Sequence, residues 1–226
     1  MGERISVIIP TLNESSCVAA TIAHLRALGE CEVIVADGGS DDGTVAQASG
    51  ADRVLTGARG RSAQMNFGAS AATGELLLFL HADCRPEAGA FAEVRRWLRK
   101  GGVAAGCFRM RVEAPGLAYR MIDEAATARV RLTGLIYGDQ GLFVRRETFD
   151  RVGGFPPLRF MEDVFISRSL RRLGRMAVAD KRVFVSDRRW RKVGVVRQTL
   201  QNWTLTALAM AGVSPDRLAA YYPVVR

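Results

Sequence analysis

The chain lacks the features that mark membrane-spanning proteins and small cysteine-built domains. Its 226 residues contain no apolar run of about 18 residues, so the sequence predicts no membrane-spanning helix. The 4 cysteines form no CxxC pair, which excludes a zinc ribbon and favours reduced thiols over disulfides. No charged and then apolar leader precedes the first strand pattern, so we expect no signal peptide and a cytoplasmic protein.

Acidic residues are scarce in one segment only. Over the whole chain, 32 Lys and Arg stand against 23 Asp and Glu, a formal net charge of +9. Residues 1–144 hold 15 basic and 16 acidic side chains, whereas residues 145–197 hold 15 basic and 6 acidic ones. Because the surplus is local, we expect one segment that faces an anion. The hydrophobic content of 48% excludes intrinsic disorder.

Short apolar runs alternate with helical patterns, most regularly in the first half of the chain. Runs that are apolar on both faces are typical of central parallel strands, so the alternation predicts an α/β protein with a parallel sheet. Without a repeat or an obvious linker, one domain over residues 1–226 is the simplest interpretation. The expected strands are 5–10, 32–37, 54–55, 75–80, 104–112, 141–145 and 183–186, and the expected helices are 15–28, 44–49, 61–73, 88–100, 117–133, 164–173 and 193–211.

A segment rich in glycine and aspartate follows the strand at 32–37. It lacks the spacing of a GxGxxG loop and the Lys of a P-loop. One interpretation is a capped turn, in which Ser40 or Asp42 caps the next helix. The other is a nucleotide pocket, in which Asp37 accepts hydrogen bonds from base or ribose and Gly39 allows a close approach.

Two further acidic sites stand next to predicted elements. Asp83 follows the strand at 75–80 and suits a hard divalent ion that bridges a diphosphate. His81 lies on the same side of the extended chain, where it is either structural or a weak second ligand. Glu162 and Asp163 precede a helix, where they either cap it or supply a general base.

Taken in order, these segments resemble family 2 glycosyltransferases with the GT-A fold. The matching segments span most of the chain and keep the order of the family's motifs. The segment 59–69 is also similar to a small soluble subgroup linked to arsenosugar-type pathways. The matching segments read IIPTLNE at 8–14, VADGGSDDGT at 35–44, LHAD at 80–83, GDQG at 138–141 and ED at 162–163.

The resemblance implies a fold and a division of the chain. The expected fold is a Rossmann-like, mostly parallel sheet flanked by helices, with a C-terminal helical elaboration. Residues 1–112 would form the nucleotide-binding half and 113–192 the acceptor-side half, followed by a C-terminal helix and tail at 193–226.

The resemblance also implies an activity. The enzyme would move a hexosyl or related group from a nucleotide-diphosphate sugar, commonly a UDP-sugar, to a small or lipid-linked acceptor hydroxyl, with inversion. Asp163 would be the general base beside Glu162, and Asp83, at the last DxD position, would hold Mg²⁺ or Mn²⁺. The expected nucleotide-binding residues are Pro10, Thr11, Glu14, Asp37, Gly39 and Arg61, and the expected sugar or acceptor residues are Asp139, Gln140, Arg189 and Trp190.

The chain departs from the family pattern at two motifs. His81 replaces the first carboxylate of DxD, which bears on metal affinity. The QxxRW motif of processive members is present only as SDRRW at 186–190, without its Gln, which disfavours a polymerising role.

The C-terminal part leaves several uses open. The basic cluster at 188–192 is either a solvated face or a contact with a diphosphate or phosphorylated acceptor. Trp190 either stacks on a sugar or packs in the core. The helix at 193–211 has apolar residues at helical spacing, which suit core packing, a homodimer contact or peripheral contact with the inner face of the membrane.

Two rival functions have their own signatures. A nucleotidyltransferase of similar fold needs a glycine-rich N-terminal loop with Arg and Lys, and residues 10–14 offer none. A non-catalytic nucleic-acid-binding protein needs basic and aromatic residues interleaved along a groove. Most aromatic residues of the basic segment fall at core-like positions, so we expect no nucleic-acid partner.

Overall fold

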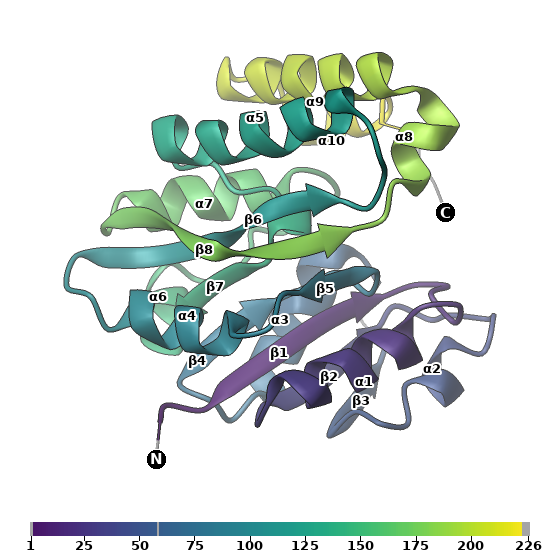
Figure 1. The fold of residues 1–226 in the computed structure, drawn as a ribbon, viewed down its shortest axis with the longest axis vertical. Coiled ribbons are helices and arrows are strands. Elements are labelled where there is room, and N and C mark those ends of the chain that lie inside the picture. The colour runs from purple at the N-terminus through teal and green to yellow at the C-terminus, as the bar shows by residue number, and fades with distance from the viewer. Residues whose placement is uncertain (1, 58, 223–226) are drawn as a thin grey trace.

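A computed structural model describes residues 2–57 and 59–222, the side chain of Arg189 excepted. Within these residues, one eight-stranded sheet has the order β3-β2-β1-β4-β7-β6-β8-β5 (Figure 1). Four strands from the first part of the chain pair in parallel. They are β1 (Ile5–Thr11), β2 (Glu32–Asp37), β3 (Arg53–Thr56) and β4 (Leu76–Phe79).

The other half of the sheet mixes directions. β7 (Leu142–Arg145) runs antiparallel to both β4 and β6 (Val103–Val112). β8 (Arg175–Val185) runs parallel to β6 and antiparallel to β5 (Cys84–Pro86). Four of the seven pairings among the described residues are parallel, which confirms the expected mostly parallel sheet.

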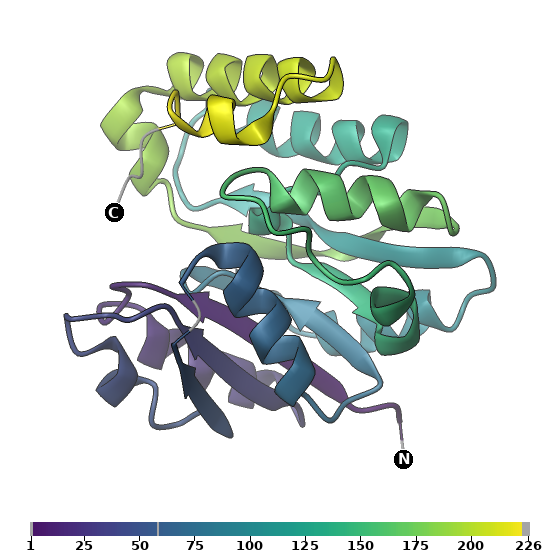
Figure 2. The ribbon, with the colours of Figure 1, turned by 180° about the vertical axis from the view of Figure 1, so that it is seen from behind.

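Helices cover both faces of the sheet. α1 (Val18–Leu28) and α4 (Ala90–Leu98) pack on one face, and α3 (Arg61–Ala71) and α7 (Glu162–Arg171) pack on the other (Figure 2). Because both faces are covered, β1 is apolar on both: Ile9 packs in one cluster and Ile8 in the other.

Small residues let α3 lie close to β1. A Cβ on Gly68 would come within 2.4 Å of Ile8 Cγ2, so only glycine fits this contact. Two short helices complete the flanks of the sheet. They are α2 (Thr44–Gln47) and α6 (Arg146–Arg151).

The C-terminal helices form a layer at one end of the molecule (Figures 1 and 2). α9 (Val195–Met210) lies beside α5 (Leu117–Thr133) and packs with α10 (Pro215–Ala219) over the start of α7. Gly194, with φ 94°, separates α9 from α8 (Arg188–Val193), a helix that the sequence pattern did not predict. Among the described residues, none of the helices has the length and apolarity needed to span a bilayer.

Candidate active site

The carboxyl ends of β1 and β2 are joined by a buried carboxylate. Asp37 is 1% exposed and accepts hydrogen bonds from Thr11 Oγ1 at 2.9 Å and from the Gly39 and Ser40 amides at 2.9 and 2.8 Å. Burial opposes the charge of this carboxylate, but these donors outweigh it and lower its pKa. Asp37 therefore stays ionised at the edge of the sheet where a nucleotide is expected.

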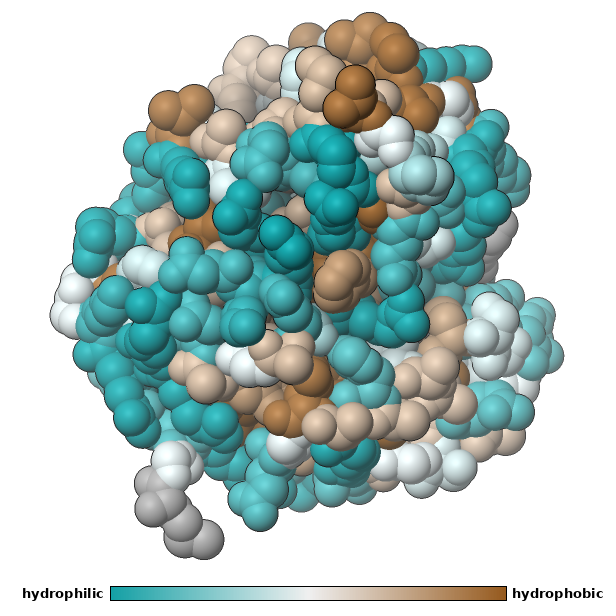
Figure 3. All heavy atoms as spheres, viewed as in Figure 1, coloured by the Kyte–Doolittle hydropathy of each residue, from teal (hydrophilic) through white to brown (hydrophobic). Residues whose placement is uncertain are grey.

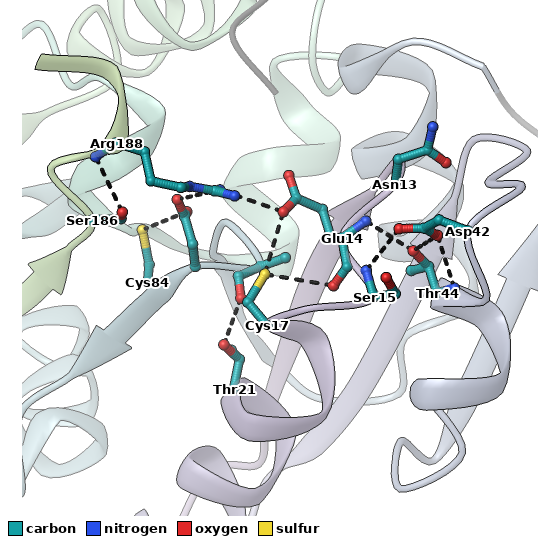
Figure 4. Close-up of polar contacts among 12 residues, drawn as sticks. Asn13, Glu14, Ser15, Cys17, Thr21, Asp42, Thr44, Cys84, Ser186 and Arg188 are labelled. Carbon is teal, nitrogen blue, oxygen red and sulfur yellow. Dashed lines mark hydrogen bonds and ion pairs between the residues drawn. The ribbon is translucent and has the colours of Figure 1, made fainter. Parts of the chain in front are cut away.

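The loop after β1 is fastened to the loop after β2 (Figure 4). The amides of Asn13 and Glu14 donate to Ser40 Oγ and Thr44 Oγ1, both at 2.8 Å. Asn13 has φ 58°, a left-handed conformation that non-glycine residues rarely adopt and that is often found at functional sites. Half-buried Pro10 precedes this loop, and Gly39 faces open space at φ 90°.

The capped-turn interpretation of this segment is correct only in part. The cap position of α2 is Gly43, at φ 87°, rather than Ser40 or Asp42. Asp42 does accept a hydrogen bond from the first amide of the helix, at Thr44, and another from the Ser15 amide at 3.0 Å. The polar residues thus hold two loops together. This arrangement is compatible with the nucleotide-pocket interpretation.

Gln64 is a part of this edge that sequence reasoning missed. Its side chain is buried on α3 and donates to the carbonyls of Thr11 at 2.6 Å and Ala36 at 2.8 Å. It joins the ends of β1 and β2 from the face of the sheet that α3 covers. The only signal for it was a polar residue on the buried side of a helix pattern.

Asp83 lies at the same edge, on the other side of β1, and is paired with Arg188. Arg188 Nη2 lies 2.9 Å from Asp83 Oδ2 and 3.4 Å from Glu14 Oε2 (Figure 4). Burial lowers the pKa of Arg188, but the pairing with Asp83 outweighs burial and raises it. The first residue of α8 therefore reaches the position predicted for a metal.

The donor set around Asp83 fits a divalent ion through its carboxylate and imidazole. His81, Asp83 and Cys84 each offer one ligand atom, and these atoms lie within 4.8 Å of one another. Burial raises the pKa of the Cys84 thiol well above its ordinary value, so this sulfur is a neutral thiol and a poor ligand for Mg²⁺ or Mn²⁺. Asp83 and His81 remain as the ligands that suit such an ion.

Asp163 occupies the first turn of α7 and is held by two backbone amides. Gly138 N donates to Oδ2 and Val164 N to Oδ1, both at 2.7 Å. Burial, followed by the negative charge of Glu162, raises the pKa of Asp163 to about 6. Met161, the residue before α7, has φ 63°, so the chain enters this helix in a left-handed conformation. This carboxylate is oriented and has a pKa suited to accepting a proton near neutral pH.

Gly138 links Asp163 to the metal-site residues. A Cβ at Gly138 would lie 2.6 Å from His81 Nε2 and 3.5 Å from Asp163 Oδ2, so both side chains converge on this glycine. Asp163 and His81 also share the wall of a cavity whose remaining lining is mostly apolar. The other lining residues are Arg61, Met65, Phe79, Leu80, Ile136, Gly138, Leu142, Phe155 and Glu162.

Glu162 does not stand free beside Asp163. It is 1% exposed and pairs with Arg61 of α3, with Nη1 to Oε1 at 3.1 Å. Arg61, predicted to bind the nucleotide, therefore lies next to the expected base, where its positive charge lowers the pKa of Asp163 and opposes the effect of Glu162. Any contact between Arg61 and a nucleotide stays a prediction.

Residues Gly138–Gln140 form a short 3₁₀ helix, η1, beside α5. Gln140 is fully buried, and its Oε1 accepts a hydrogen bond from Arg129, whose guanidinium lies 3.3 Å from the centre of the Tyr137 ring. The Asp139 carboxylate is near this guanidinium, but burial dominates and raises its pKa. Gln140 thus braces the loop that carries Gly138 to Asp163.

Trp190 and Arg189 are the other two residues predicted to contact the sugar or acceptor. Trp190 is 8% exposed and packs in the main hydrophobic cluster, which favours the core interpretation over stacking on a sugar. It also lines a pocket between α5 and α9, together with Asp139. The side chain of Arg189 lies outside the described residues.

Comparisons with known proteins identify the family and the fold. Residues 6–165 match the sequence profile described as glycosyl transferase family 2. The comparison with curated proteins found no match.

Several solved structures share the fold. A mannosyltransferase from Pyrobaculum calidifontis, in complex with GDP-Man and Mn²⁺, has a TM-score of 0.71 at 20% identity, over 95% of this chain and 66% of its own. Glucosyl-3-phosphoglycerate synthase from Mycobacterium tuberculosis, in complex with Mn²⁺, UDP-glucose and phosphoglyceric acid, has a TM-score of 0.64 at 21% identity. The match covers 94% of this chain and 81% of the synthase. TarS from S. aureus, in complex with UDP-GlcNAc, has a TM-score of 0.65 at 19% identity. The match covers 81% of this chain and 58% of the TarS chain.

The length of the match differs among these proteins. The chain spans about two thirds of the mannosyltransferase and less of TarS. At these identities, the solved structures show a common fold. The family match extends over most of the chain, from β1 to the acidic pair on α7. The chain therefore belongs to glycosyl transferase family 2.

Proposed function

We propose that the chain is an inverting glycosyltransferase that uses a nucleotide-diphosphate sugar, with UDP as the nucleotide, and transfers the sugar to an acceptor hydroxyl. The observation that carries the proposal is Asp163. Two backbone amides orient its carboxylate, and its pKa is raised to about 6. Its side chain and that of His81 converge on Gly138, near the edge of the sheet where Asp83 lies. The neighbours in complex with UDP-glucose, UDP-GlcNAc or GDP-Man support a nucleotide-sugar donor.

The donor side of the site belongs to residues 1–112. The nucleotide lies over the loops that follow β1 and β2, where Thr11 and Asp37 form one wall and Pro10, Glu14 and Gly39 another. Asp37 is ionised, and a hydrogen bond from the imide N–H of uracil would replace one of the four that its oxygens accept from Thr11, Gly39 and Ser40. The diphosphate then points toward Asp83, across the end of β1.

Asp83 and His81 would hold Mg²⁺ or Mn²⁺, and the bound ion would supply positive charge that stabilises the leaving diphosphate. The mannosyltransferase and the phosphoglycerate-dependent synthase that share the fold contain Mn²⁺, which supports this assignment. Arg188 pairs with Asp83. We propose that its guanidinium turns to the diphosphate when the donor binds, because a guanidinium matches phosphate oxygens in geometry and charge.

The acceptor side belongs to residues 113–192. Asp163 takes the proton of the acceptor hydroxyl, and the acceptor oxygen forms a bond to the anomeric carbon on the face opposite the diphosphate. The bond from the anomeric carbon to the diphosphate oxygen breaks, and its electron pair leaves with UDP. Configuration at the anomeric carbon inverts, and the proton remains on Asp163.

A thermal-shift screen of nucleotide sugars, with and without Mn²⁺, tests the donor part of the proposal. A donor that binds the native state raises the melting temperature in proportion to the logarithm of its concentration over Kd. We expect a UDP-sugar to raise the melting temperature, and Mn²⁺ to increase this shift. In Asp83→Asn, the increase with Mn²⁺ should be lost. No stabilisation by any nucleotide sugar would contradict it.

A further inference from the structure

The outer faces of α5 and α9 expose large apolar side chains side by side. Leu117 and Met121 of α5 are 82% and 73% exposed, and Val196 of α9 is 71% exposed. Leu200 and Trp203 of α9 are at least half exposed and follow Val196 at helical spacing. We call these five residues the α5–α9 apolar face. Figure 3 shows hydrophobic atoms gathered at the end of the molecule where both helices lie in Figure 1.

Basic residues adjoin this face without acidic ones between them. Residues 188–215, which cover α8 and α9, contain five Lys and Arg and no Asp or Glu. Arg197 is exposed on α9, one residue after Val196, and Arg191 is exposed on α8. Asp187, the acidic residue before this stretch, pairs with Arg191 at 2.9 Å, and Glu124 of α5 pairs with Arg109 at 2.9 Å. Asp216, the acidic residue after it, is exposed at the start of α10.

We propose that the α5–α9 apolar face and the basic residues of α8 and α9 dock the enzyme on an anionic lipid bilayer. A helix with one apolar face, Trp near its edge and cations beside it lies in the interfacial plane of a membrane. α9 has this character, since its opposite side packs into the protein through Gln198, Leu205 and Ala209. Each Lys or Arg near an anionic surface adds to the attraction.

Charge favours the bilayer over a second copy of the chain. A two-fold dimer through this face would set the basic α8 and α9 of one copy near those of the other, because such an interface is self-complementary. Like charges then oppose the contact, whereas an anionic lipid surface complements them.

The proposed face is connected to the active site through α8. Arg188 at the start of α8 pairs with Asp83, and Gly194 at its end leads directly into α9. Tyr137, which precedes η1, also shares a hydrogen bond of 2.7 Å with Thr206 of α9. A docked molecule would thus keep its acceptor-side loops close to the lipid surface.

Co-sedimentation of the full chain with vesicles tests the proposal. We expect binding to vesicles of phosphatidylcholine mixed with phosphatidylglycerol, little binding to phosphatidylcholine alone, and weakening with salt. The fluorescence of Trp203, which is half exposed, should shift to shorter wavelength on binding, and Trp203→Phe should lose this shift. Equal binding to both kinds of vesicle, or none to either, would overturn the proposal.

Matched pairs of variants test the two components separately. Val196→Gln with Leu200→Gln should lower the vesicle partition coefficient about tenfold or more. Phe67→Gln with Leu173→Gln, which removes two exposed apolar side chains elsewhere, should leave it unchanged. Similar losses for both pairs would overturn the assignment of this face.

The charge component has a matched control as well. Lys192→Gln with Arg197→Gln should lower binding to anionic vesicles about tenfold. Arg151→Gln with Arg172→Gln removes the same charge from the basic segment away from α8 and α9 and should have a small effect. Equal effects of the two pairs would mean that net charge alone drives binding, which overturns the proposal.

Light scattering separates docking from dimerisation. The proposal expects a monomer whose mass does not change in Val196→Gln with Leu200→Gln. A dimer that these substitutions dissociate would show that a second copy covers the face. None of these measurements needs a donor or acceptor, so they can fail while the proposed transfer reaction stands, and the reverse.

Discussion

Two aspartates, one in each half of the molecule, show how the surroundings of a carboxylate shift its pKa in opposite directions. Asp37 follows a buried strand and has donors on both carboxylate oxygens, so its pKa is lowered despite burial. Asp163 also accepts two amide hydrogen bonds, but burial and the charge of Glu162 dominate, and its pKa is raised to about 6. The first suits a fixed acceptor for a ligand, and the second suits a group that exchanges a proton.

Removing the carboxylate of Asp163 should have the largest effect. Asp163→Asn cannot accept a proton, so kcat should fall about 10²–10⁴-fold. Donor affinity should change little if Asp163 acts on the acceptor, as proposed. Steady-state kinetics and donor titration measure the two quantities, and Asp150→Asn, an exposed acidic residue of α6, is the control. Undiminished kcat in Asp163→Asn would remove its assignment as the base.

A methyl group at Gly138 should have the next largest effect. The Cβ of Gly138→Ala would lie 2.6 Å from His81 Nε2, so His81 or the loop must move, and Asp163 loses its alignment. Displacement of this kind costs up to about 10²-fold in rate. Gly101→Ala, where a Cβ meets open space, should keep wild-type kcat. A wild-type rate in Gly138→Ala would show that the convergence on Gly138 has no catalytic role.

Weakening the support of Asp37 should change binding and stability rather than chemistry. Thr11→Val removes a buried hydrogen bond of 2.9 Å to a charged acceptor, so the free energy of unfolding should fall by about 1.5–3 kcal/mol. Donor KM should rise while kcat at saturating donor stays close to wild type. Urea unfolding and kinetics test this, with Thr148→Val on α6 as the control. A loss confined to kcat would contradict the division between the halves.

The smallest expected effects concern the pair that joins the two halves. Arg188→Gln removes the positive charge that pairs with Asp83. Direct titration without donor should therefore show Mn²⁺ binding severalfold tighter. Asp83→Asn should weaken the same binding. If both substitutions left Mn²⁺ affinity unchanged, the ion would bind elsewhere.

Much of the first half could be predicted from the sequence because both faces of its strands are buried. The strand at 32–37 has the predicted bounds, as does the helix at 117–133 in the second half. The parallel order also explains why Asp37 and Asp83 lie at one edge, on either side of β1.

Elements with mixed burial escaped prediction. β8 begins at Arg175 rather than at residue 183, because three charged residues, 180–182, separate the short apolar run at 176–179 from the predicted strand. β5 has three residues and ends at Pro86, so no strand pattern marks it.

The contacts that complete the site were out of reach for a different reason. Arg188 and Asp83 are 105 residues apart in the chain, and Arg61 and Glu162 are 101 apart. Charge counts predicted a basic segment, but only the fold shows which carboxylate each arginine meets. The resemblance to an arsenosugar-linked subgroup stays a prediction.

The pH dependence of kcat/KM tests the central claim most directly, because it reports the pKa of the base in the free enzyme. Since the carboxylate must be ionised to accept a proton, kcat/KM should rise with pH through a midpoint near 6, the raised pKa of Asp163. A midpoint near 3.8, the ordinary value for aspartate, or a profile with no acidic limb would contradict the account.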